Sequence, residues 1–102
     1  MKTTKEIGEE FQKLCPAVSD PYLRENTEYF DYYFVSSGFT KQDEYFAITL
    51  YEHKDNPGVT KAEVTFTTEN PYKIGGILKS IEPELKVSLQ VKLPATYETV
   101  VI

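Results

Sequence analysis

The sequence predicts an α+β fold, a two-layer sandwich in which two helices cover one face of an antiparallel sheet of about five strands. Two segments carry apolar residues at helical spacing, and several others alternate apolar and polar residues as half-buried strands do. The connections between these segments are short, which favours antiparallel pairing. The 102 residues, of which 40% are hydrophobic and 26% charged, suit a single globular domain over residues 1–102.

The first expected helix begins after Thr3, because Thr3 and Glu6 have the spacing of a capping box. Ile7, Phe11 and Leu14 follow at intervals of four and three residues, so we expect all three on one buried helical face. A proline two residues further on ends this helix, since proline lacks the backbone N–H that a helix interior needs.

The next part of the chain changes from helical to strand character. Ser19-Asp20-Pro21 carries a helix-start signal, so one or two helical turns are expected over residues 22–26. Residues 27–36 are rich in aromatic and β-branched side chains on both parities, which predicts a strand covered on both faces. Two serines and a glycine at residues 36–38 predict a turn after it.

The remaining segments complete the order α-(α)-β-β-β-α-β-β. Residues 44–53 and 59–67 predict a hairpin around a polar loop, with Phe46, Ile48 and Leu50 on the inner face of its first strand. Asn70-Pro71 predicts the start of a helix over residues 72–81, which contains the pair Gly75-Gly76. We expect this pair to pack close to the sheet, or else to contact a partner. Strands are expected over residues 85–93 and 95–102, with a bend or sheet edge at Pro94.

All of the net charge of −5 comes from the first half of the chain. Residues 1–53 hold five Lys and Arg against ten Asp and Glu, whereas residues 54–102 hold six of each. This excess of acid disfavours a protein that binds duplex nucleic acid. The first ten residues lack the apolar stretch of a secretory signal, and no segment has the roughly 20 apolar residues of a membrane span. We therefore expect a cytoplasmic protein that makes no membrane contact.

The residues that usually carry catalysis are few. Cys15 is the single cysteine and His53 the single histidine, so no internal disulfide can form, and a reducing compartment is indicated. Nothing in their spacing brings the two together as a nucleophilic Cys–His pair requires, so we expect Cys15 in the core and His53 exposed at a strand end. The sequence therefore predicts no enzyme, no metal site, no cofactor and no small-molecule substrate.

Tyrosine is the residue type that points to binding, with eight tyrosines and no tryptophan in the chain. Tyr45 and Tyr51 have the parity opposite to the inner residues of their strand, and one of Tyr29, Tyr32 and Tyr33 should join them. Tyrosine is enriched at interfaces, although it also favours strands and stabilises sheets by cross-strand pairing. The predicted binding face consists of Tyr45, Thr49, Tyr51, Lys61, Thr65 and Lys86.

The sequence is interpreted as a small acidic regulatory module that binds a protein partner, or a second copy of itself as a dimer, through this face. Two alternatives stay open. The ten acids of the first half suit an inhibitor that imitates nucleic acid. The tyrosines and lysines of the face suit a protein that stacks single-stranded nucleic acid.

Overall fold

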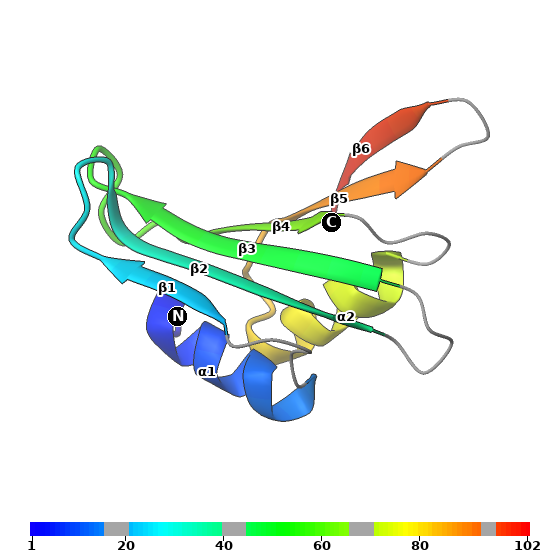
Figure 1. Ribbon diagram of the computed structural model, residues 1–102, viewed down its shortest axis with the longest axis horizontal. Helices are drawn as coiled ribbons and strands as arrows, with labels where there is room; N and C mark the ends of the chain where they lie inside the picture. Colours follow the sequence, from blue (N-terminus) through cyan, green and yellow to red (C-terminus); the bar gives the residue numbers. More distant parts are fainter. Residues whose placement is uncertain (16–20, 40–44, 66–70, 93–95) are drawn as a thin grey trace.

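A computed structural model describes residues 1–15, 21–39, 45–65, 71–92 and 96–102. Two helices lie next to each other on one face of a six-stranded sheet (Figure 1), which confirms the α+β class. The elements in chain order are α1 (Thr4–Leu14), β1 (Tyr22–Glu25), β2 (Phe30–Phe39), β3 (Tyr45–His53), β4 (Lys61–Thr65), α2 (Pro71–Ile81), β5 (Val87–Lys92) and β6 (Tyr97–Val101).

The strands lie in the sheet in the same order as in the sequence. Neighbouring strands are antiparallel with one exception, the parallel pair β4 and β5. The expected antiparallel sheet of about five strands is therefore close but not exact, since the sheet has six strands and one parallel pairing. Helix α2 connects β4 to β5 and contacts both. A crossover helix returns the chain to the end of the sheet at which the previous strand began, so the next strand runs parallel to it.

Residues 22–26, which were expected to form helical turns, contain strand β1. Tyr22 to Glu25 pair antiparallel with Val35 to Tyr32 of β2. A segment this short cannot offset the cost of nucleating a helix, whereas pairing with a long neighbouring strand satisfies its backbone groups. Asn26 then turns the chain with a φ of 51°, a left-handed conformation that asparagine tolerates.

The turn expected at residues 36–38 is also wrong, because these residues belong to β2. They pair with residues 46–48 of β3, and β2 continues to Phe39. The residues between β2 and β3 lie outside the described part of the chain. Two serines and a glycine stay extended here because the neighbouring strand supplies hydrogen-bond partners that a local turn would have to replace.

The core lies between the helices and the sheet, with α1 packed on β2 and β3 and α2 packed on β4 and β5. Phe46, Ile48 and Leu50 are fully buried, so the predicted inner face of β3 is confirmed. The rings of Phe11 and Phe46 meet edge to face with centroids 6.3 Å apart, which joins α1 to the middle of the sheet.

The prediction for Leu14 is wrong, because its side chain is 62% exposed. The buried stripe of α1 includes Gly8, which brings the helix close to β2. A Cβ on Gly8 would lie 3.2 Å from the Tyr32 hydroxyl. At the end of the helix Cys15, four residues after Phe11, packs against the core, as expected for this cysteine, and Leu14 points away from it.

Helix α2 begins at Pro71, and its two glycines differ in their surroundings. A Cβ on Gly75 would lie 2.8 Å from a Leu89 methyl and 2.9 Å from an Ile102 methyl, whereas a Cβ on Gly76 would meet nothing within 4 Å. Gly75 therefore packs close to the sheet as expected. Asn70, Pro94 and residues 66–67, on which other expectations rested, lie outside the described residues. Both helices have 11 residues, and among the described residues none is long and apolar enough to cross a membrane.

Candidate binding face

The sheet has one face that no described helix covers, opposite α1 and α2 (Figure 1). We call it the open face. Its side chains alternate along the strands with buried ones: Tyr33 lies between Tyr32 and Phe34, and Tyr51 follows Leu50. Tyr33 and Tyr51 pair across β2 and β3, so their rings stand together on this face.

Five aromatic side chains form a continuous band on the open face, which we call the aromatic band: Tyr22, Phe30, Tyr33, Tyr51 and His53. Phe30 is at its centre, with ring centroids 5.1 Å from Tyr33, 6.0 Å from Tyr51 and 4.6 Å from His53. Tyr22 extends the band to β1, where its ring meets that of Tyr33 at 6.1 Å and an interplanar angle of 81°. Such tilted and edge-to-face contacts are the favoured geometry for aromatic pairs.

A β-bulge brings Phe30 into the aromatic band. Phe30 pairs with His53, and Tyr32, two residues further along β2, pairs with Glu52, which is only one residue away from His53 in β3. Asp31 is therefore an extra residue in β2. Strict alternation would have placed Phe30 on the helix side with Tyr32, which is only 7% exposed. The band exists at its full width because of this local irregularity.

The structure places the six predicted site residues along the open face, but in three groups. Tyr51 and Thr49 line a hollow of about 310 Å³ in the aromatic band, together with Glu63 of β4. Tyr45 lies at the other end of β3, with its ring centroid 5.6 Å from that of Phe39.

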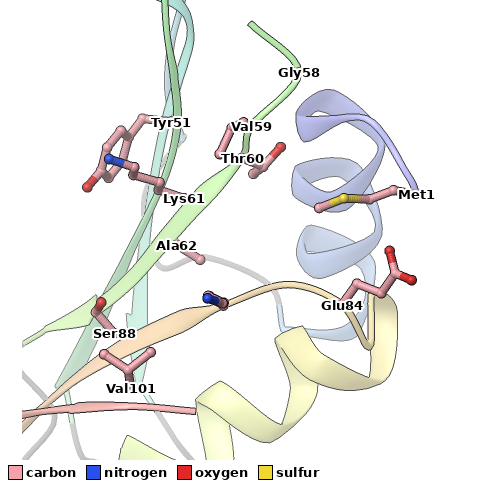
Figure 2. A pocket seen from close by; sticks show the side chains of 11 residues that line it. Met1, Tyr51, Gly58, Val59, Thr60, Lys61, Ala62, Glu84, Ser88 and Val101 are labelled. Atoms are coloured by element: carbon pink, nitrogen blue, oxygen red, sulfur yellow. The ribbon is translucent and has the colours of Figure 1, made fainter. Parts of the chain in front are cut away.

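The third group, on β4 and before β5, includes a second hollow. The Thr65 hydroxyl donates a hydrogen bond to the Ala47 carbonyl at 3.5 Å. Lys61 and Lys86 line a hollow of about 590 Å³ at the beginning of β4 and β5, which we call the β4–β5 pocket (Figure 2). Tyr51 lines it as well, so this pocket adjoins the aromatic band.

Two polar contacts shape the chemistry of the aromatic band. The Tyr51 hydroxyl donates a hydrogen bond of 2.9 Å to Glu63. Burial raises the pKa of Tyr51 to about 12, and the hydrogen bond to the Glu63 carboxylate contributes in the same direction. At the β1 edge, the Arg24 guanidinium carbon lies 4.6 Å from the centroid of the Tyr22 ring, within cation–π distance.

Sequence reasoning missed several residues of this site. Tyr22 and Arg24 were assigned to a helix, although their two-residue spacing also suits one face of a strand. Of the three tyrosines considered on the neighbouring strand, Tyr33 is the one on the open face. His53 is half-buried against Phe30 rather than exposed. Glu63 shares the outward parity of the predicted Lys61 and Thr65, so the alternation of β4 already indicated its position.

The open face presents apolar ring area, a cation and hydrogen-bonding groups at its surface. Among the described residues, no three His, Cys, Asp or Glu side chains lie together as a metal site requires. Cys15 packs against the core on the helix side, where burial raises the pKa of its thiol, and His53 lies on the open face.

Comparison with known proteins finds no matching protein family, no similar curated protein and no similar solved structure.

Proposed function

We propose that this protein is a binding module whose open face recognises an acidic, partly apolar segment of a partner protein. The observation that carries the proposal is the aromatic band, which lies on the face that no described helix covers. Aromatic side chains supply large contact area at a low entropic cost, and tyrosine is among the residues that dominate binding energy at interfaces.

The charges of the open face identify the chemistry of the partner. Among the described residues, Arg24, Lys61 and Lys86 lie on this face, and the nearby Glu63 accepts the Tyr51 hydrogen bond. The chain as a whole carries −5, so the open face is more basic than the rest of the protein. An acidic segment would be attracted to it, whereas a second copy docked through the same face would bring like cations together.

The arrangement of charges and rings favours this function over the two alternatives. The acids of α1 are interleaved with lysines, and ion pairs join Lys2 to Glu10 at 2.8 Å and Lys5 to Glu25 at 3.8 Å, so they make a poor imitation of a phosphate backbone. Single-stranded nucleic acid requires ring faces that are free for stacking. The rings of the aromatic band pack mainly edge to face on one another.

A module of this kind would regulate its partner by binding alone. It would catalyse no reaction and need no metal or cofactor of its own. We place it in the cytoplasm, since its single cysteine suits a reducing compartment.

Selection of short random peptides on the wild-type protein tests this proposal. Selected peptides are expected to be enriched in Asp and Glu over Lys and Arg, and to contain apolar or aromatic residues. Two-dimensional amide NMR of their complexes should show shifts at Arg24, Tyr33 and Tyr51. Peptides that are basic, peptides that bind the helix side, or a selection that yields no binder would each overturn the proposal. A single-stranded oligonucleotide that binds the open face more tightly than every selected peptide would replace it with the stacking alternative.

Matched variants make the test specific for the open face. Tyr33→Ala and Arg24→Gln should each weaken a selected peptide by at least about fivefold. Tyr72→Ala is the control, because Tyr72 is also a half-exposed tyrosine but belongs to α2. An equal loss in Tyr72→Ala and Tyr33→Ala would contradict the assignment of binding to the aromatic band. Since the chain has no tryptophan, a change in tyrosine fluorescence that is present in the wild type and in Tyr72→Ala but lost in Tyr33→Ala would report the contact.

A further inference from the structure

The β4–β5 pocket is lined by two exposed lysines, Lys61 and Lys86, and neither forms an ion pair with a described acid. Ala62 pairs with Val87 and Glu63 with Ser88, so Lys61 and Lys86 are the two residues that directly precede the first pair of this parallel ladder. Neighbouring strands lie about 4.8 Å apart, and like charges directly opposite each other destabilise a sheet. The parallel pairing of β4 and β5 alone creates this juxtaposition, because the two lysines are 25 residues apart in the sequence.

The acids around this pair do not neutralise it. Neither Lys61 nor Lys86 forms an ion pair with a described acid. Glu63 accepts the hydrogen bond from Tyr51, and Glu84 lies with Met1 on the far side of the pocket from Tyr51 and Lys61 (Figure 2). Both side chains are exposed, so their ammonium groups are accessible to a ligand from solution.

The rest of the pocket is partly apolar. Its volume of about 590 Å³ lies within the range of roughly 300–1,000 Å³ that is common for ligand sites. Met1, Val59, Ala62 and Val101 supply apolar wall, and Ser88 supplies a hydroxyl beside the lysine pair. A pocket that is apolar except for a few convergent polar groups orients its ligand by those groups.

We infer that the β4–β5 pocket binds a small organic phosphate, a phosphomonoester whose apolar group packs against the pocket wall. A phosphomonoester carries a charge of about −1.5 to −2 at neutral pH, which matches two ammonium groups, and its three terminal oxygens can accept from both lysines and from Ser88. A single carboxylate would leave one lysine uncompensated. This site adjoins the aromatic band and shares Lys61 and Lys86 with the open face, but the phosphate contact does not depend on the proposed peptide contact.

Titration of the free protein with four probes, followed by two-dimensional amide NMR, tests the inference. Phenyl phosphate should give saturable shifts at Thr60, Lys61, Ser88 and Val101, and should bind more tightly than inorganic phosphate or benzoate, while benzyl alcohol should not bind. If benzoate or benzyl alcohol binds as tightly as phenyl phosphate, the role of the lysine charges is contradicted. If inorganic phosphate binds as tightly as phenyl phosphate, the role of the apolar wall is contradicted. Shifts confined to another surface, or no saturation at millimolar ligand, would overturn the site itself.

Variants separate this site from a general effect of charge and from the proposed peptide contact. The double change Lys61→Gln and Lys86→Gln should weaken phenyl phosphate at least about tenfold, by loss of two charge-assisted hydrogen bonds. Lys73→Gln, an exposed lysine of α2, should leave its affinity unchanged, and so should Arg24→Gln, which weakens the peptide. Equal affinities in the double variant and the wild type would overturn the inference.

A stability measurement on the ligand-free protein gives an independent readout. Lys86→Gln should raise the Tm by about 1–4 °C at low ionic strength, because it removes the repulsion across the strand pair. A fall in Tm would mean that the lysine pair serves the fold and would count against a ligand site. Phenyl phosphate should raise the Tm of the wild type but not that of the double variant, since only the folded wild type binds it.

Discussion

The hydroxyl of Tyr51 donates a hydrogen bond of 2.9 Å to a carboxylate oxygen of Glu63. Glu63 pairs with Thr49 in the β3–β4 ladder, so this contact runs diagonally across the two strands. It connects the aromatic band to the strand that carries the lysine of the β4–β5 pocket. It also favours the neutral phenol, since an ionised Tyr51 would lie against the Glu63 carboxylate.

The first prediction concerns stability at alkaline pH. Burial is the main reason why the pKa of Tyr51 and of Tyr32 rises from 10.0 to about 12. The folded protein therefore keeps these protons at a pH where the unfolded chain has lost them. Their contribution to stability is complete below about pH 10 and is lost as the pH rises to about 12. Denaturant midpoints measured across this range should fall, and should fall less in Tyr51→Phe. A midpoint that stays constant to pH 12 would contradict the prediction.

The second prediction separates the two causes of the Tyr51 shift. Glu63→Gln removes the carboxylate charge but leaves the phenol buried, so the pKa of Tyr51 should fall yet remain above 10.0. Ultraviolet absorbance of tyrosinate during a pH titration measures this, with Tyr51→Phe identifying which transition belongs to Tyr51. Glu98→Gln, a change on the distant strand β6, is the matched control and should leave the transition in place. An unchanged transition in Glu63→Gln would show that the hydrogen bond has no influence.

The third prediction compares the two glycines of α2. Alanine is better than glycine in a helix interior by about 1 kcal/mol, so Gly76→Ala should stabilise the protein by up to that amount. Gly75→Ala gains the same propensity but forces a methyl group against Leu89 and Ile102. We expect it to be less stable than Gly76→Ala by about 1–3 kcal/mol, the usual cost of overpacking. Chemical denaturation measures both, and equal stabilities would contradict the close approach of α2 to the sheet.

The fourth prediction tests the orientation of α1. Phe11→Ala should destabilise the protein by about 3–5 kcal/mol, because it leaves a cavity against Phe46. Leu14→Ala should cost less than about 0.5 kcal/mol, since that side chain is exposed. Thermal or denaturant unfolding distinguishes them. A large loss of stability in Leu14→Ala would show that Leu14 lies on the buried face of α1, as the sequence predicted.

The fifth prediction concerns Glu52, whose carboxylate joins three parts of the fold. It accepts hydrogen bonds from the Thr4 hydroxyl at the start of α1 and from the backbone N–H of Gly58 in the β3–β4 loop. Hydrogen bonds to charged groups contribute about 1.5–3 kcal/mol, so Glu52→Ala should lower the free energy of unfolding by an amount of that order. Thr60, whose hydroxyl also contacts Thr4, should show faster amide hydrogen exchange in this variant. Wild-type stability and exchange would contradict the role of Glu52.

The helices and most strands were predictable because their signals are local. The capping box at Thr3 and Glu6 is present with both of its hydrogen bonds, and α2 begins at the predicted proline. The alternation of β4 placed Ala62 and Val64 inside and Lys61 outside, as the sequence indicated. Side-chain periodicity of this kind depends only on the geometry of one element.

The candidate site was predictable only in part, because its members come from different elements. Tyr51 was placed correctly by the parity of β3, but Phe30 reached the same face through a bulge that shifts the parity of β2. Tyr22 joined through a strand whose sequence also carried a helix-start signal. Whether a local signal prevails depends on which neighbour offers backbone partners, and that is a property of the assembled sheet.

By itself the sequence determined the α+β class, the two helices and the inner residues of β3, since these follow from spacing within single segments. The tertiary structure decided the parallel pairing of β4 and β5, the membership of Tyr22 and Phe30 in the aromatic band, and the meeting of Lys61 with Lys86. The physical reason is that strand register depends on contacts between residues far apart in the chain, and periodicity within a segment carries no information about them.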